Sequence, residues 1–166
     1  MAARADDTPR DTVIEYPNRD KAAAKLVRLV VVGLLLASTA VIVVMSLGGW
    51  EATQDARTGQ IVFAVLYVLL AVYIARWRSG MLPVAAALAT LLALFAAVAA
   101  PQWFARDKAG FDSPPLEGSV LGVLAVVIIG LQLAIIVFAT AGFRQRWSVE
   151  VESRPDGSRA GRPQTA

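Results

Sequence analysis

The sequence contains no cysteine and no histidine. Without cysteine, the chain cannot form a disulfide, a thiol redox couple or a thiolate site for zinc or an iron–sulfur cluster. Without histidine, it lacks the usual axial ligand of haem, the commonest metal ligand and the usual proton shuttle. We therefore expect no cofactor and no metal site, and the enzyme classes that need either residue are excluded.

A second absence lies within the apolar segments. Four long apolar runs contain no lysine, arginine, aspartate or glutamate, although functional sites inside membranes usually include an ionisable residue. The acidic residues between the runs match neither a catalytic constellation nor the ligand spacing of an EF-hand loop. These acidic residues are Glu51, Asp55, Asp107, Asp112 and Glu117. We therefore predict no catalytic residues and expect a protein that is not an enzyme.

The four apolar runs dominate what is present in this chain of 166 residues, of which 57% are hydrophobic. A helix needs about 20 mostly apolar residues to cross the hydrocarbon core, and tryptophan prefers the headgroup layer. Each run closes on a tryptophan, and these four predicted interface anchors are Trp50, Trp77, Trp103 and Trp147. The pattern predicts an all-α integral membrane protein, a four-helix transmembrane bundle within residues 19–147. We expect the helices at about 19–48, 59–77, 81–101 and 118–146, with Pro101 stopping the third.

The basic residues predict the orientation of this bundle. Of the 16 lysines and arginines, 13 fall on one side if that side holds both tails and the turn after the second run. The positive-inside rule then places both termini in the cytoplasm. The tails, residues 1–18 and 148–166, are rich in polar residues, proline and glycine, so we expect them to be disordered. The Ala-, Val-, Arg- and Gly-rich composition is typical of a high-GC bacterium, which indicates the plasma membrane.

The basic residues at the ends of the runs also bear on partners. The chain has a net charge of +3, but this charge is clustered beside the membrane, so we expect lipid headgroups and not nucleic acid to meet it. The candidate headgroup contacts are Lys21, Lys25, Arg28, Arg76, Arg78, Arg144 and Arg146.

Small residues recur along the predicted helices at intervals of four. Such strips let two helices approach closely, which is how helices associate in lipid. The third run carries Ala85, Ala89, Ala93 and Ala97, and the fourth carries Gly118, Gly122 and Gly130. Gly33 and Ala37 form a shorter strip in the first run. The strips predict packing within this chain, or contact with a membrane-protein partner or another copy. Only about five residues separate the second and third runs, which predicts a tight antiparallel hairpin.

Gln132 is the one strongly polar residue inside the fourth run. An amide buried in lipid without a partner is costly, so we expect an interhelical hydrogen bond from Gln132. The available partners are Ser38, Thr39, Tyr67 and Thr90. One such bond contributes about 1 kcal/mol or less, so we expect Gln132→Leu to leave folding nearly intact. In the alternative interpretation, Gln132 lines a polar path for a substrate.

Two functions remain open from the sequence. The first is a structural or accessory component that packs against a larger membrane complex through its small-residue faces. The second is a small oligomeric transporter or channel without an ionisable intramembrane site, with Gln132, Thr90, Tyr67 and Ser38 along its pore. The sequence favours the first.

Overall fold

The computed structural model describes residues 13–15, 21–49, 56–106, 115–145 and 151–153. In this part of the chain four helices are present: α1 (Ala22–Gly48), α2 (Arg57–Ala75), α3 (Met81–Ala105) and α4 (Gly118–Arg144). All four are long and apolar enough to cross a membrane. The expectation of an all-helical, four-span fold is therefore confirmed at the level of length and composition.

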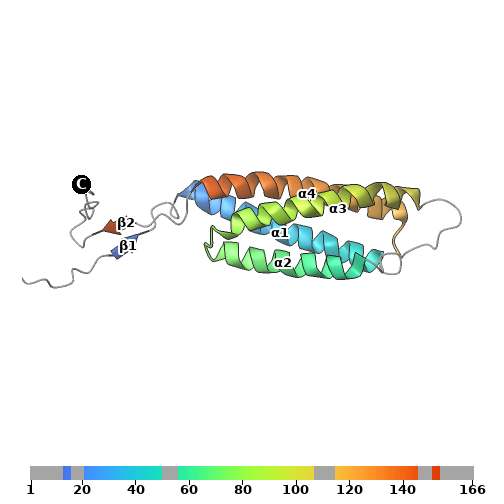
Figure 1. Ribbon diagram of the computed structural model, residues 1–166, viewed down its shortest axis with the longest axis horizontal. Coiled ribbons are helices and arrows are strands. Elements are labelled where there is room, and N and C mark those ends of the chain that lie inside the picture. The colour runs from blue at the N-terminus through green and yellow to red at the C-terminus, as the bar shows by residue number, and fades with distance from the viewer. Residues whose placement is uncertain (1–12, 16–20, 50–55, 107–114, 146–150, 154–166) are drawn as a thin grey trace, which may run out of the picture.

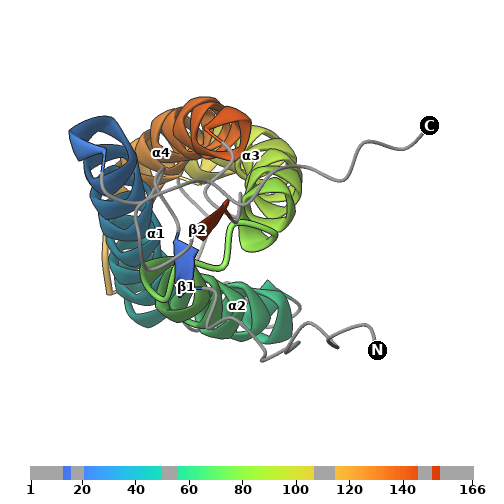
Figure 2. The same ribbon diagram turned by 90° about the vertical axis from the view of Figure 1, so that its left-hand side faces the viewer.

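The helices lie side by side in the spatial order α2, α1, α4, α3 (Figure 2). The most extensive interface joins α3 to α4, and further interfaces join α1 to α2 and α1 to α4. In contrast, α2 and α3 scarcely touch, although they are consecutive in the chain. The prediction of a tight hairpin is therefore wrong in its packing, because each arm is held by a different neighbour. One end of the bundle faces the two tails (the tail end), and the other carries the two longer connections (the loop end; Figure 1).

The ends of two helices differ from the expected positions. Helix α3 continues through Pro101 to Ala105, because a proline removes only one helical hydrogen bond and the following turn buries Trp103. Helix α2 ends at Ala75, two residues early, because Trp77 adopts a left-handed backbone with φ of 62°. The expected start of α1 at residue 19 lies outside the described residues, and α1 begins at Ala22.

Two short strands lie beyond the tail end of the bundle. Strand β1 (Val13–Glu15) pairs antiparallel with β2 (Val151–Ser153), with Ile14 opposite Glu152. The sequence predicts disordered tails, but these six residues form two paired strands in the structure. The β-branched residues of both segments favour extended backbone, and the helices bring both tails to the same end. The other tail residues lie outside the described part.

The small-residue strips do not stay on one face of their helices. Ala85 and Ala89 are fully buried, Ala93 is half-buried and Ala97 is exposed. A step of four residues turns a helix by about 40° beyond a full circle, so three steps carry the strip away from α4. The buried face of α3 continues instead through Ala96 and Ala100.

The same drift divides the glycines of α4 and α1. Gly118 and Gly122 are buried, whereas Gly130 and Gly33 are exposed, and no atom lies within 4 Å of a Cβ built at either of the last two. At Gly122 such a Cβ would approach the ring of Phe104 to 2.8 Å. The glycine therefore allows α3 and α4 to approach closely at the loop end, so this part of the predicted packing face is occupied within the chain.

Candidate functional site

A buried cluster of three polar side chains joins three helices near the middle of the bundle. The Tyr67 hydroxyl of α2 donates to Gln132 Oε1 of α4 at 2.6 Å, and Gln132 Nε2 donates to Ser38 Oγ of α1 at 3.2 Å. All three residues have no exposed surface. The structure thus supplies two of the four partners that the sequence offered. We call these residues the Gln132 cluster.

The Gln132 cluster does not continue into a polar path. Thr90, which the transport interpretation needs beside it, is exposed and donates to the Ala86 carbonyl of its own helix. Thr39 likewise donates to the carbonyl of Leu35. Of the four side chains predicted to line a pore, Ser38, Tyr67 and Gln132 therefore meet and bond to one another, whereas Thr90 does not join them.

A second contact fixes the tail end of α2. The amides of Trp77 and Arg78 donate to the carbonyls of Ile74 and Tyr73, the arrangement known as a Schellman motif. Glycine usually occupies the left-handed position of this motif, but here it is Trp77. Arg28 of α1 donates to the Ala75 carbonyl at 3.0 Å, and its guanidinium lies 4.1 Å from the Trp77 ring centre. Arg28, one of the predicted headgroup contacts, is therefore engaged within the bundle.

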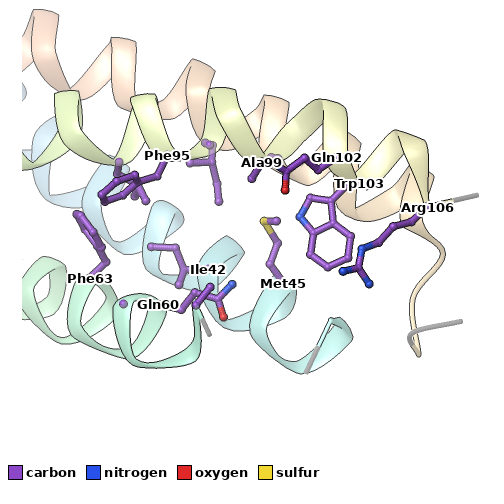
Figure 3. A pocket seen from close by; sticks show the side chains of 15 residues that line it. Ile42, Met45, Gln60, Phe63, Phe95, Ala99, Gln102, Trp103 and Arg106 are labelled. Atoms are coloured by element: carbon purple, nitrogen blue, oxygen red, sulfur yellow. The ribbon is translucent and has the colours of Figure 1, made fainter. Parts of the chain in front are cut away.

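The sparse contact between α2 and α3 leaves a cavity of about 480 Å³ in the loop-end half of the bundle (Figure 3). We call it the lateral cleft. It is open at the side, where Gly59 of α2 and Phe95 of α3 are exposed. Its volume falls in the range of about 300–1,000 Å³ that is usual for ligand pockets. Most of the lining is apolar, with Ile42, Met45, Leu92, Ala96, Ala99 and Ile128 among the residues that form it.

The inner limit of the lateral cleft is a pair of aromatic rings. Phe63 of α2 and Phe95 of α3 meet edge to face with their ring centres 6.1 Å apart. Phe63 also meets Tyr67 edge to face at 6.1 Å, so the inner end of the cleft rests on the Gln132 cluster. The pair therefore lies near the tail-end limit of the cleft, where Leu92 also lines it.

The loop-end mouth of the lateral cleft carries its one charged side chain among the described residues. Arg106 and Gln102 line this end together with Trp103 (Figure 3). The Arg106 guanidinium lies 5.2 Å from the Trp103 ring centre, a cation–π contact. Gln60 lies deeper in the cleft, one turn of α2 from Phe63, and its Oε1 accepts a hydrogen bond from Ser46 Oγ at 3.0 Å. The cleft is thus a largely apolar slot with a cationic side chain at one end.

No protein family model matches this chain, and comparison with curated proteins and with solved structures gives no match.

The predicted interface anchors have different surroundings. Trp103 is buried and lines the lateral cleft, so its indole faces the bundle. The indole turns inward because α3 continues past Pro101, and the role of Trp103 as an interface anchor stays a prediction. Trp77 is half-buried against Arg28. Trp50, Trp147 and Arg146 lie outside the described residues.

The remaining headgroup candidates are exposed at the tail end. These are Lys21, Lys25, Arg76, Arg78 and Arg144. Sequence reasoning missed the residues of the lateral cleft, because Gln60, Gln102 and Arg106 occur singly beside apolar runs. The sequence feature that could have indicated the cleft is a set of two glutamines and one arginine at helix ends on the same predicted side of the membrane.

Proposed function

We propose that this protein is a non-enzymatic, multi-pass membrane protein that binds a lipid-like amphiphile in the lateral cleft. The observation that carries this proposal is a largely apolar slot between α2 and α3 whose one charged side chain, Arg106, lies at its loop-end mouth. An amphiphile has the same distribution of polarity along its length. The polar groups of the Gln132 cluster bond to one another, which favours binding of an amphiphile over conduction of a polar substrate.

The length of the lateral cleft suits an extended apolar chain. Phe95 and Arg106 are eleven positions apart on α3, a rise of about 16 Å. An acyl chain that lies along this slot is covered by apolar side chains of all four helices, among them Ile42, Met45 and Ile128.

An accessory role in a larger complex is compatible with this binding function. Its expected docking faces are partly used within the chain, since Ala85, Ala89 and Gly122 are buried against neighbouring helices. Such a component would then present the amphiphile, bound at the side of the bundle, to its complex.

We expect Gly59→Leu to reduce amphiphile retention at least tenfold without destabilising the bundle. Gly59 lines the lateral cleft, and no atom lies within 4 Å of a Cβ built on it. A leucine there fills space that the amphiphile needs and also favours the helix by about 1 kcal/mol. Native mass spectrometry of protein purified in mild detergent measures the retained molecule.

Gly130→Leu is the matched control, because Gly130 is also helical and open but lies outside the cleft lining. It should retain the amphiphile like the unchanged protein. Equal retention in both variants would contradict the proposal. A co-purifying polypeptide displaced by Gly59→Leu would identify a partner segment as the occupant instead.

The proposed orientation places both termini in the cytoplasm of a bacterial plasma membrane. The chain has no native cysteine, so single cysteines report their side directly. We expect Ser79→Cys to react with an impermeant maleimide only after the membrane is opened, and Ser113→Cys to react in intact cells. The reverse labelling pattern would refute this orientation.

A further inference from the structure

We propose that the lateral cleft selects a lipid with an anionic headgroup, which Arg106 and Gln102 bind at the loop end. This inference rests on the proposed function, since it names the chemical class of the bound amphiphile. It also assigns the lipid to the leaflet on the loop-end side, which is the outer leaflet in the proposed orientation.

The charge of the mouth is the first argument. Arg106 is the only charged residue that lines the lateral cleft among the described residues. A guanidinium matches the geometry of phosphate and carboxylate, because it donates two parallel hydrogen bonds. Its contact with Trp103 holds the guanidinium over the indole beside the cleft (Figure 3). The mouth therefore favours an anion over a zwitterion or a cation.

The groups beside Arg106 are the second argument. Arg106 offers only hydrogen-bond donors, and Gln102, one turn earlier on α3, adds an amide to the same edge. The oxygens of a phosphate diester accept from both side chains. In a zwitterionic headgroup the phosphate is accompanied by an ammonium group, which the guanidinium repels.

The depth of the lateral cleft is the third argument. The rise of about 16 Å from Phe95 to Arg106 is close to half of the hydrocarbon core, which is about 30 Å thick. A lipid of one leaflet can therefore place its headgroup at Arg106 while one of its chains reaches the Phe63–Phe95 pair. The lining on α3 ends within one turn of that pair, at Leu92, so the length of the cleft matches one leaflet and not the whole bilayer.

A competition experiment tests this selectivity. Delipidated full-length protein in mild detergent is mixed with equal amounts of phosphatidylglycerol and phosphatidylcholine that have identical acyl chains. Native mass spectrometry then gives the ratio of the two bound lipids. We expect the unchanged protein to prefer phosphatidylglycerol about tenfold, because both phosphates accept hydrogen bonds from Arg106 but only the choline headgroup brings a cation beside it. Arg106→Gln should reduce the preference to about twofold or less while total lipid binding persists.

Arg57→Gln is the matched control, because Arg57 is the other described arginine at the loop end and lies outside the cleft lining. It should leave the preference unchanged. An equal loss in Arg57→Gln would assign the preference to basic residues in general and overturn the inference. Binding of both lipids without preference would overturn it as well but leave the proposed function standing. If the unchanged protein retains no lipid at all, the proposed function itself fails.

Discussion

Ala89→Leu should destabilise the bundle by about 3 kcal/mol, whereas Ala97→Leu should change its stability by no more than about 0.5 kcal/mol. Ala89 has no exposed surface and lies on α3, whose most extensive interface is with α4. A leucine adds three carbon atoms where packing leaves no room, so the two helices must separate or adopt strained side chains. At Ala97, the same atoms project away from the bundle.

The comparison of these two alanines separates the folded structure from the sequence pattern. Both belong to the predicted strip of alanines at intervals of four, so the sequence pattern predicts the same packing role for both. Both substitutions replace alanine by leucine. Unfolding by SDS in mixed micelles, followed by circular dichroism, measures the difference. Similar losses at Ala89 and Ala97 would mean that the strip stays on one face of α3 and that the described packing is wrong.

Gln132→Leu should destabilise the protein by about 2 kcal/mol, more than the single interhelical bond considered from the sequence. The substitution removes two hydrogen bonds at once. It also leaves the hydroxyls of Tyr67 and Ser38 in fully buried positions, and stranding a buried polar group costs more than a lost bond contributes. The expectation of nearly intact folding is therefore replaced by a measurable loss.

A combined variant tests the reason for that loss. Replacing all three members of the Gln132 cluster (Ser38→Ala, Tyr67→Phe and Gln132→Leu) removes every stranded group, so this variant should be more stable than Gln132→Leu alone. Thr90→Val is the control, because Thr90 is exposed and bonds only its own helix; it should change stability by less than about 0.5 kcal/mol. A neutral Gln132→Leu, or a triple variant less stable than the single one, would contradict this account.

The sequence was sufficient for the features that depend on single segments. Length and composition indicate four spans because the hydrocarbon core imposes a minimum apolar length on each helix. The partners of Gln132 could be narrowed to four because polar side chains are few inside the runs. The choice among them could not be made, since Ser38 and Tyr67 meet Gln132 only through the rotation of α1 and α2 about their axes.

The lateral cleft could not be predicted from the sequence for a related reason. It exists because α2 and α3 pack on different neighbours, and no local pattern encodes which pairs of helices stay apart. The inward rotation of Trp103 also depends on the continuation of α3 past Pro101. A rule that proline ends a helix placed that indole in the headgroup layer, whereas burial in the following turn outweighed the single lost hydrogen bond.

The contact between Arg28 and Trp77 has a consequence for biosynthesis. The last turn of α2 is completed by a side chain 47 residues upstream, and the left-handed Trp77 is unfavourable without that neighbour. If the chain inserts into a membrane from its N-terminus, α1 is inserted before residues 75–78 are made. Arg28, which donates to the Ala75 carbonyl, is then already in place. A fragment of α2 and α3 alone would have to make its reversal without this support. The smallest unit that contains both the reversal from α2 to α3 and the supporting Arg28 therefore spans α1, α2 and α3.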